Sequence, residues 1–125
     1  MTQKQKTSLQ DEHSMTVRSL IKPGHEVLLP LTPADCYLLH AAIGICGEAG
    51  ELADAIKKAT IYRKELDLEN VIEEMGDIEF FLEALRSHLN ISRAETLQAN
   101  IDKLRKRYPE GGYSDNQAQV RADKV

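Results

Sequence analysis

GEAGEL at residues 47–52 and EEMGDI at residues 73–78 are the two stretches that decide the fold class of this chain of 125 residues. Each stretch holds two acidic residues three positions apart, namely Glu48, Glu51, Glu74 and Asp77. Residues three apart in a helix project from neighbouring turns of one face, so each stretch would present two carboxylates together. This arrangement is typical of a clamp for a hard cation.

Apolar residues recur around both stretches at the spacing of a helix, about 100° of rotation per residue. The first segment carries an apolar stripe of Leu38, Ala42, Ile45, Ala49, Leu52 and Ile56. The second carries a stripe of Leu68, Val71, Met75, Ile78, Leu82, Leu85 and Leu89. On this projection Glu48 lies at the margin of its stripe and Glu74 lies inside the margin of its own. Two consecutive helices are therefore expected to carry the same acidic edge.

Capping and breaker residues predict where the helices begin and end. Thr32 as N-cap, with a proline at the first helical position, predicts a long helix that continues to about Thr60. The second acidic helix is expected to begin at about Leu68. A capping box, Ser92 with Glu95, opens a third helix that runs to about residue 107, before a proline.

The ends of the chain are expected to contribute less regular structure. A short fourth helix is expected after Ser114. Residues 1–15 are polar without periodicity, which predicts a disordered arm, and residues 16–31 predict an irregular or extended segment. Residues 16–125 are expected to form a single helical domain.

The predicted fold class is all-α, with three main helices and a short C-terminal one. So few helices cannot surround a core comfortably, and each isolated subunit would leave an apolar face uncovered. The sequence therefore predicts a homo-oligomer, either a dimer or a tetramer.

Composition is that of an ordinary soluble domain, with 42% hydrophobic and 29% charged residues. A net charge of −4 argues against a general nucleic-acid binder. No apolar run approaches the roughly 20 residues of a membrane span, and the N-terminus lacks a signal pattern. Cys36 and Cys46 lie about 15 Å apart along one expected helix, too far for a mutual disulfide. They indicate core thiols in a reducing cytoplasm.

Four carboxylates at the margin of an apolar face need positive charge nearby, because burying an uncompensated carboxylate is costly. One possibility is that these carboxylates pair with Lys or Arg, or that their side chains bend toward solvent. The other is that they bind a metal cation. Oxygen ligands suit Mg²⁺ or Mn²⁺, and neither His40 nor His88 stands at ligand spacing from the acidic motifs. Because Mg²⁺ usually takes substrate phosphates as further ligands, such a site predicts a phosphorylated substrate.

The third helix carries a stripe of hydrogen-bond donors beside its apolar face. Asn100, Lys103 and Arg107 fall at positions i, i+3 and i+7. Such donors suit phosphate oxygens. The alternative is a solvated basic helix end that complements the helix dipole.

These residues together resemble the MazG-like all-α nucleoside triphosphate pyrophosphohydrolases. The resemblance lies in the run from Gly47 to Leu52, then Ala55-Ile56-Lys57-Lys58, and then Glu73 to Ile78 with Phe80 and Phe81. It continues in the closing run Asn100-x-x-Lys103-Leu104-x-x-Arg107-Tyr108-Pro109-x-Gly111. It extends over about residues 32–123.

The resemblance implies magnesium-dependent hydrolysis of a nucleoside triphosphate between the α and β phosphates, with Mn²⁺ as a possible substitute ion. The products would be the nucleoside monophosphate and pyrophosphate. It implies that the metal ligands are Glu48, Glu51, Glu74 and Asp77, and that the phosphates are contacted by Lys103, Arg107 and Asn100. The expected catalytic residues are Glu48, Glu51, Lys103 and Arg107.

Two further residues are candidates for substrate contact. Tyr62, in the loop between the acidic helices, would stack on the base or else pack on the bundle. Arg121 would reach the triphosphate of its own or a neighbouring subunit. Gly47 stands where many family members carry the first of two adjacent glutamates, so the general base is not assigned, although Glu51 is a candidate.

Two alternatives remain at this point. A phosphoribosyl-ATP pyrophosphohydrolase would use a similar acidic bundle on a different nucleotide, and activity on plain triphosphates distinguishes it. A non-catalytic helical dimerisation module would leave the carboxylates facing solvent, and Mg²⁺ would then give no specific rise in melting temperature.

Overall fold

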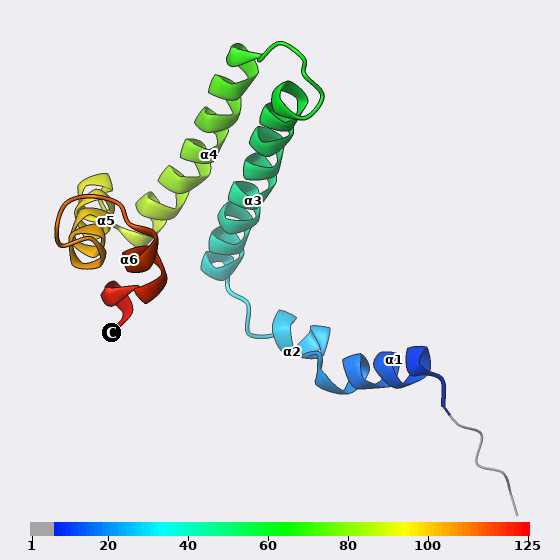
Figure 1. The fold of residues 1–125 in the computed structure, drawn as a ribbon. Coiled ribbons are helices and arrows are strands. Elements are labelled where there is room, and N and C mark those ends of the chain that lie inside the picture. The colour runs from blue at the N-terminus through cyan, green and yellow to red at the C-terminus, as the bar shows by residue number, and fades with distance from the viewer. Residues whose placement is uncertain (1–6) are drawn as a thin grey trace, which may run out of the picture. The chain divides into compact units, whose positions relative to one another are not determined.

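The computed structural model describes residues 7–125, and all regular structure in this range is helical. In chain order the elements are α1 (Leu9–Leu20), α2 (Gly24–Leu28), α3 (Pro33–Thr60), α4 (Leu68–Leu89), α5 (Arg93–Arg107), α6 (Asp115–Val120) and the 3-10 helix η1 (Ala122–Lys124) (Figure 1). The predicted all-α class is confirmed. None of the described helices combines the length and apolar character needed to cross a membrane.

The N-terminal part differs from the expectation. The chain divides after Cys36 into two units. In the first, α1 occupies residues that were expected to belong to a disordered arm and an irregular segment. Ser8 caps this helix by accepting a hydrogen bond from the backbone N–H of Asp11 at 3.1 Å, and the first turn is acidic while the last is basic. Such capping favours a helix without an apolar stripe. Residues 1–6 of the expected arm lie outside the described residues, and a single domain over residues 16–125 stays a prediction.

The predicted starts of the later helices are confirmed by their caps. The backbone N–H of Asp35 donates to Thr32 Oγ1 at 3.1 Å, and the backbone N–H of Thr32 donates to the Asp35 carboxylate at 2.9 Å. Ser92 and Glu95 form the expected capping box at the start of α5. Ser114 accepts a hydrogen bond at the start of α6. Each cap satisfies backbone donors that the first helical turn leaves unpaired.

In the second unit, α3 and α4 form an antiparallel hairpin (Figure 1). Near its open end the ring of Tyr37 stacks on that of His88, with centroids 4.5 Å apart. Further along, the ring of Phe81 lies against Gly44 so closely that a Cβ on that glycine would come within 2.5 Å of ring carbons. A side chain at this position would require the Phe81 ring to move, so the glycine allows the ring to lie directly against α3.

The hairpin buries little apolar surface. Over the described residues, the buried apolar side chains are Ala41 and Ala55. The face of α4 that meets α3 includes Glu74, which is only 8% exposed, whereas Met75 from the predicted stripe is 55% exposed. Glu74, which was expected inside the margin of the stripe, is therefore more deeply buried than Met75, because one neighbouring helix covers only part of a wide apolar arc. Large apolar residues such as Ile43 stay uncovered.

The chain after α5 turns back along that helix. Gly111 adopts a φ of 80° in the connecting turn, and α6 and η1 both contact α5. Arg121 has a φ of 51° between α6 and η1, in the left-handed region. This conformation ends α6 and redirects the last residues toward α5.

Candidate metal centre

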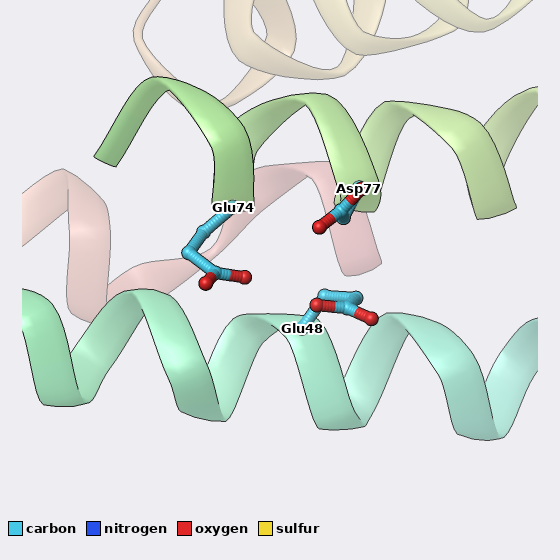
Figure 2. Close-up of side chains that lie close together, drawn as sticks. All are labelled: Glu48, Glu74 and Asp77. Carbon is cyan, nitrogen blue, oxygen red and sulfur yellow. The ribbon is translucent and has the colours of Figure 1, made fainter. Parts of the chain in front are cut away.

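Three carboxylates from the two facing helices converge at the seam of the hairpin. Glu48 projects from α3, and Glu74 and Asp77 project from α4 (Figure 2). One oxygen from each of these side chains lies within 4.8 Å of one from each of the others. Glu74 is buried, Glu48 is half-buried and Asp77 is exposed. We call these three residues the acidic triad.

The triad arises from local helix geometry on both sides. On α4, Glu74 and Asp77 stand three residues apart and therefore project from adjacent turns of one face. On α3, Glu48 falls on the face that also buries Ala41 and Ala55, seven residues away in each direction. A spacing of seven residues is close to two helical turns, so this face returns to α4 at each of these positions.

One carboxylate oxygen of Glu74 lacks a hydrogen-bond partner. This Oε2 atom is buried and accepts no hydrogen bond within the described residues. Burial raises the pKa of Glu74 to about 7, with further contributions from Glu48, Glu51 and Asp77. An unpaired buried carboxylate is unfavourable in a protein interior. At neutral pH this carboxyl therefore requires either a proton or a cation.

The donor set of the triad fits a hard cation. It consists of carboxylate oxygens alone, which suit Mg²⁺ or Mn²⁺ better than zinc. The nearby histidines have other contacts, since His88 stacks on Tyr37 and the ring centroid of His40 lies 5.9 Å from that of Phe81. That neither histidine is a ligand stays a prediction.

Glu51, the fourth predicted ligand, does not belong to the triad. It is exposed, one turn further along α3, and its charge contributes to the raised pKa of Glu74. It borders an open depression of about 450 Å³ on the surface of the hairpin. The lining residues are Gly47, Gly50, Glu51, Asp54, Lys58, Asn70 and Glu74. The role of Glu51 as a ligand stays a prediction.

Two polar residues beside the triad were not predicted to be part of the site. Asn70 lies one turn before Glu74 on α4, a spacing that could have identified it. Lys58 borders the same depression, and its Nζ lies 2.8 Å from a carboxylate oxygen of Asp54. These residues bring one cation and one amide to the edge of an otherwise acidic surface.

The donor stripe of α5 is not joined to the triad by any hydrogen bond or ion pair among residues 7–125. Asn100 and Lys103 are exposed. Arg107 instead forms a bidentate ion pair with Asp123, at 2.7 and 3.0 Å. Asp123 was not identified from the sequence, because no periodic spacing connects residues sixteen positions apart. The phosphate-binding roles of the stripe stay predictions.

The two remaining candidates are both on the surface. Tyr62 is 61% exposed in the loop between α3 and α4, and Lys57 Nζ lies 5.7 Å from the centroid of its ring. Base stacking by Tyr62 and its alternative, packing on the bundle, both stay predictions. Arg121 is exposed at the junction of α6 and η1.

Comparison with known proteins places this site in a family. Residues 39–112 match the profile of the MazG nucleotide pyrophosphohydrolase domain. The chain belongs to the MazG family. The matched range contains the whole acidic triad and the donor stripe of α5, so the predicted resemblance is confirmed. A nucleotide hydrolase reaction is therefore the general assignment.

One relative of this MazG-family chain is Gene 37 protein of Mycobacterium phage L5. It is 30% identical over 88 residues, which cover 63% of this chain and 75% of the phage protein. No solved structure was found that matches the chain.

Proposed function

We propose that this MazG-family protein hydrolyses nucleoside triphosphates between the α and β phosphates, with magnesium as its cofactor. The products are the nucleoside monophosphate and pyrophosphate. The observation that most supports a metal-dependent reaction is the buried, unpartnered Oε2 of Glu74 within the acidic triad. Family membership supplies the reaction class.

The acidic triad would hold the ion, with Glu51 as an additional ligand from the edge of the depression. When bound, Mg²⁺ or Mn²⁺ supplies positive charge that neutralises phosphate oxygens and lowers the pKa of an attacking water. Glu51 is the proposed proton acceptor for this water. It is exposed and close to the triad without belonging to it, so it can exchange protons with solvent.

Positive side chains would bind the phosphates that leave as pyrophosphate. Lys103 and Arg107 on α5 are the proposed cations, and Asn100 adds an amide donor. Charge-assisted hydrogen bonds from such groups become stronger as negative charge develops on the leaving group. Tyr62 and Arg121 are proposed to contact the base and the triphosphate, in keeping with their exposure.

A homo-oligomer is part of this proposal, as a dimer or a tetramer. Large apolar side chains on both helices of the hairpin stay uncovered, including Leu39 and Ile43 on α3 and Ile72 and Phe80 on α4. Exposed apolar patches of this kind are typical of association surfaces. Cys36 and Cys46, which were expected in the core, are both exposed. As free thiols they support a cytoplasmic location, where cysteines stay reduced.

The alternatives differ in what they predict for substrate and metal. A dimerisation module without activity would leave the carboxylates in solvent, whereas Glu74 is buried. A phosphoribosyl-ATP pyrophosphohydrolase would be inactive on plain triphosphates. Incubation with canonical and modified nucleoside triphosphates and millimolar Mg²⁺, followed by detection of pyrophosphate, tests the proposal. Release of pyrophosphate from at least one triphosphate is expected, and orthophosphate as the primary product would overturn it.

A further inference from the structure

The C-terminal segment holds the guanidinium of Arg107 in one orientation. Arg107 is the last residue of α5, and Asp123 lies in η1. Nε of Arg107 donates to Oδ1 of Asp123 at 2.7 Å, and Nη2 donates to Oδ2 at 3.0 Å. Two parallel hydrogen bonds between a guanidinium and a carboxylate fix the relative orientation of both planar groups.

The backbone around η1 places Asp123 against α5. Arg121 adopts the left-handed conformation at the end of α6, so the chain turns sharply there. The backbone N–H of Lys124 then donates to the carbonyl of Arg121 at 2.9 Å, which closes the turn. The carboxylate of Asp123 therefore reaches Arg107 from a short, internally bonded segment.

The burial of the pair is unequal. The side chain of Asp123 is 1% exposed, whereas that of Arg107 is 17% exposed. The hydrogen bonds from Arg107 lower the pKa of Asp123 to about 2, so this carboxyl is ionised at neutral pH. An anion that displaced Asp123 would leave a buried charge without its partner, which is strongly unfavourable. A phosphate is therefore expected to join the pair instead of replacing Asp123.

The guanidinium has donors left for such a phosphate. Arginine carries five N–H groups in a rigid planar fork. Asp123 takes one N–H from Nε and one from Nη2, and the Tyr108 side chain is a further acceptor beside the guanidinium, so two of the five N–H groups stay available. Arg107 can consequently hold Asp123 along one edge and a phosphate oxygen along another.

We propose that Asp123 is a positioning residue that orients Arg107 toward the pyrophosphate group of the substrate. This inference rests on the proposed function, in which Arg107 binds phosphate. The family match ends at residue 112, so Asp123 lies outside it. In the opposite arrangement Asp123 occupies the place of the phosphate and blocks Arg107. Removing the charge of Asp123 would then strengthen pyrophosphate binding instead of weakening it.

The test compares pyrophosphate binding by the full-length protein and its variants, measured by titration calorimetry with Mg²⁺. Asp123→Asn keeps the size of the side chain and removes its charge. It is expected to weaken pyrophosphate binding about ten-fold, the range of one charge-assisted contact. The same substitution in an Arg107→Ala background should have no further effect, because the group that Asp123 orients is then absent. Asp102→Asn is the matched control, since Asp102 lies on α5 and, within the described part of the chain, its side chain bonds Gln98 alone, at 2.8 Å.

Three results would overturn the inference. Tighter binding by Asp123→Asn would show that Asp123 blocks Arg107. An unchanged affinity, or an equal loss in both backgrounds, would show that Asp123 only anchors the C-terminal segment. If Asp123→Asn loses helix content by circular dichroism, Asp123→Glu provides the same comparison, because it keeps the charge and moves the carboxylate by one methylene.

Hydrolysis assays separate this inference from the proposed function. In one outcome the wild type hydrolyses a nucleoside triphosphate while the effects of the Asp123 and Arg107 substitutions on pyrophosphate binding are independent of each other. That result would overturn the inference and leave the proposed function standing. Coupled effects on pyrophosphate binding without turnover of any triphosphate would overturn the proposed reaction and leave the inference standing. A wild-type protein that neither binds pyrophosphate nor hydrolyses triphosphates would overturn both.

Discussion

Glu48 on α3 and Glu74 on α4 face each other across the seam of the hairpin, where side chains of a helical pair are normally apolar. The two carboxylates and that of Asp77 come within 4.8 Å. Like charges at this separation repel unless they share a proton or a cation. The hairpin therefore places a cluster of mutually repelling carboxylates where the proposed metal would bind.

Replacing Glu74 with Gln is expected to lower the rate of hydrolysis by about a hundred-fold or more, because a ligand charge is lost while the shape of the side chain is kept. Helix content should be unchanged, and Mg²⁺ should no longer raise the melting temperature. Glu73→Gln is the matched control, since Glu73 is the exposed neighbour on the same helix. Near-full turnover of Glu74→Gln at saturating Mg²⁺ would remove Glu74 from the site.

The metal-free protein is expected to lose stability as the pH rises from about 4.5 to about 7. Glu74 has a pKa raised from 4.5 to about 7, mainly by burial, so in this interval the folded state binds more protons than the unfolded state. The loss of folding stability caused by ionising buried Glu74 is absent below about pH 4.5 and complete above about pH 7. Urea unfolding in EDTA at several pH values measures the slope, and Glu74→Gln should flatten it. An equal slope in both proteins would assign the effect to other groups.

Glu51→Gln should separate the ligand role from the role of proton acceptor. Because Glu51 stands outside the acidic triad, we expect this substitution to weaken Mg²⁺ binding less than Glu48→Gln does. Turnover should still fall by about a hundred-fold or more, within the usual range for loss of a general base. Metal titration monitored by melting temperature, together with kcat at saturating Mg²⁺, gives both quantities. Equal loss of metal affinity in the two variants would make Glu51 an ordinary ligand.

Lys103→Ala and Arg107→Ala should differ in their effect on stability. Each is expected to weaken catalysis by about 1–3 kcal/mol through loss of a charge-assisted contact. Lys103 is exposed and has no ion pair in the described part of the chain, so its loss should leave the melting temperature nearly unchanged. Arg107→Ala should also lower the melting temperature, because it leaves the buried carboxylate of Asp123 without its ion-pair partner. Equal melting temperatures would show that the Arg107–Asp123 pair contributes little.

The parts of the fold that were predictable depend on local chemistry. Caps act within three residues, so Thr32, Ser92 and Ser114 were enough to predict where helices begin. The acidic triad was predictable in the same way, since Glu74 and Asp77 share a face by spacing alone. A short connection between α3 and α4 then brings Glu48 to them across the seam.

The parts that were not predictable depend on tertiary packing. Helical periodicity gives a broad apolar arc, and it cannot tell which part of that arc a single neighbour covers. Met75 was therefore expected to be buried, whereas Glu74 is buried in its place. Asp123 meets Arg107 only because Arg121 turns the chain. The helix α1 lies in a stretch whose polar composition predicts disorder, and its start depends on the Ser8 cap.

The position of bond cleavage tests the central claim most directly. In water enriched in ¹⁸O with Mg²⁺ present, a hydrolysed nucleoside triphosphate should yield labelled nucleoside monophosphate and unlabelled pyrophosphate, as mass spectrometry would show. This result follows from attack at the α phosphorus, with the pyrophosphate held as the leaving group by Lys103, Arg107 and the ion. Label in the pyrophosphate would mean attack at the β phosphorus, and orthophosphate as the first product would contradict the proposed reaction altogether.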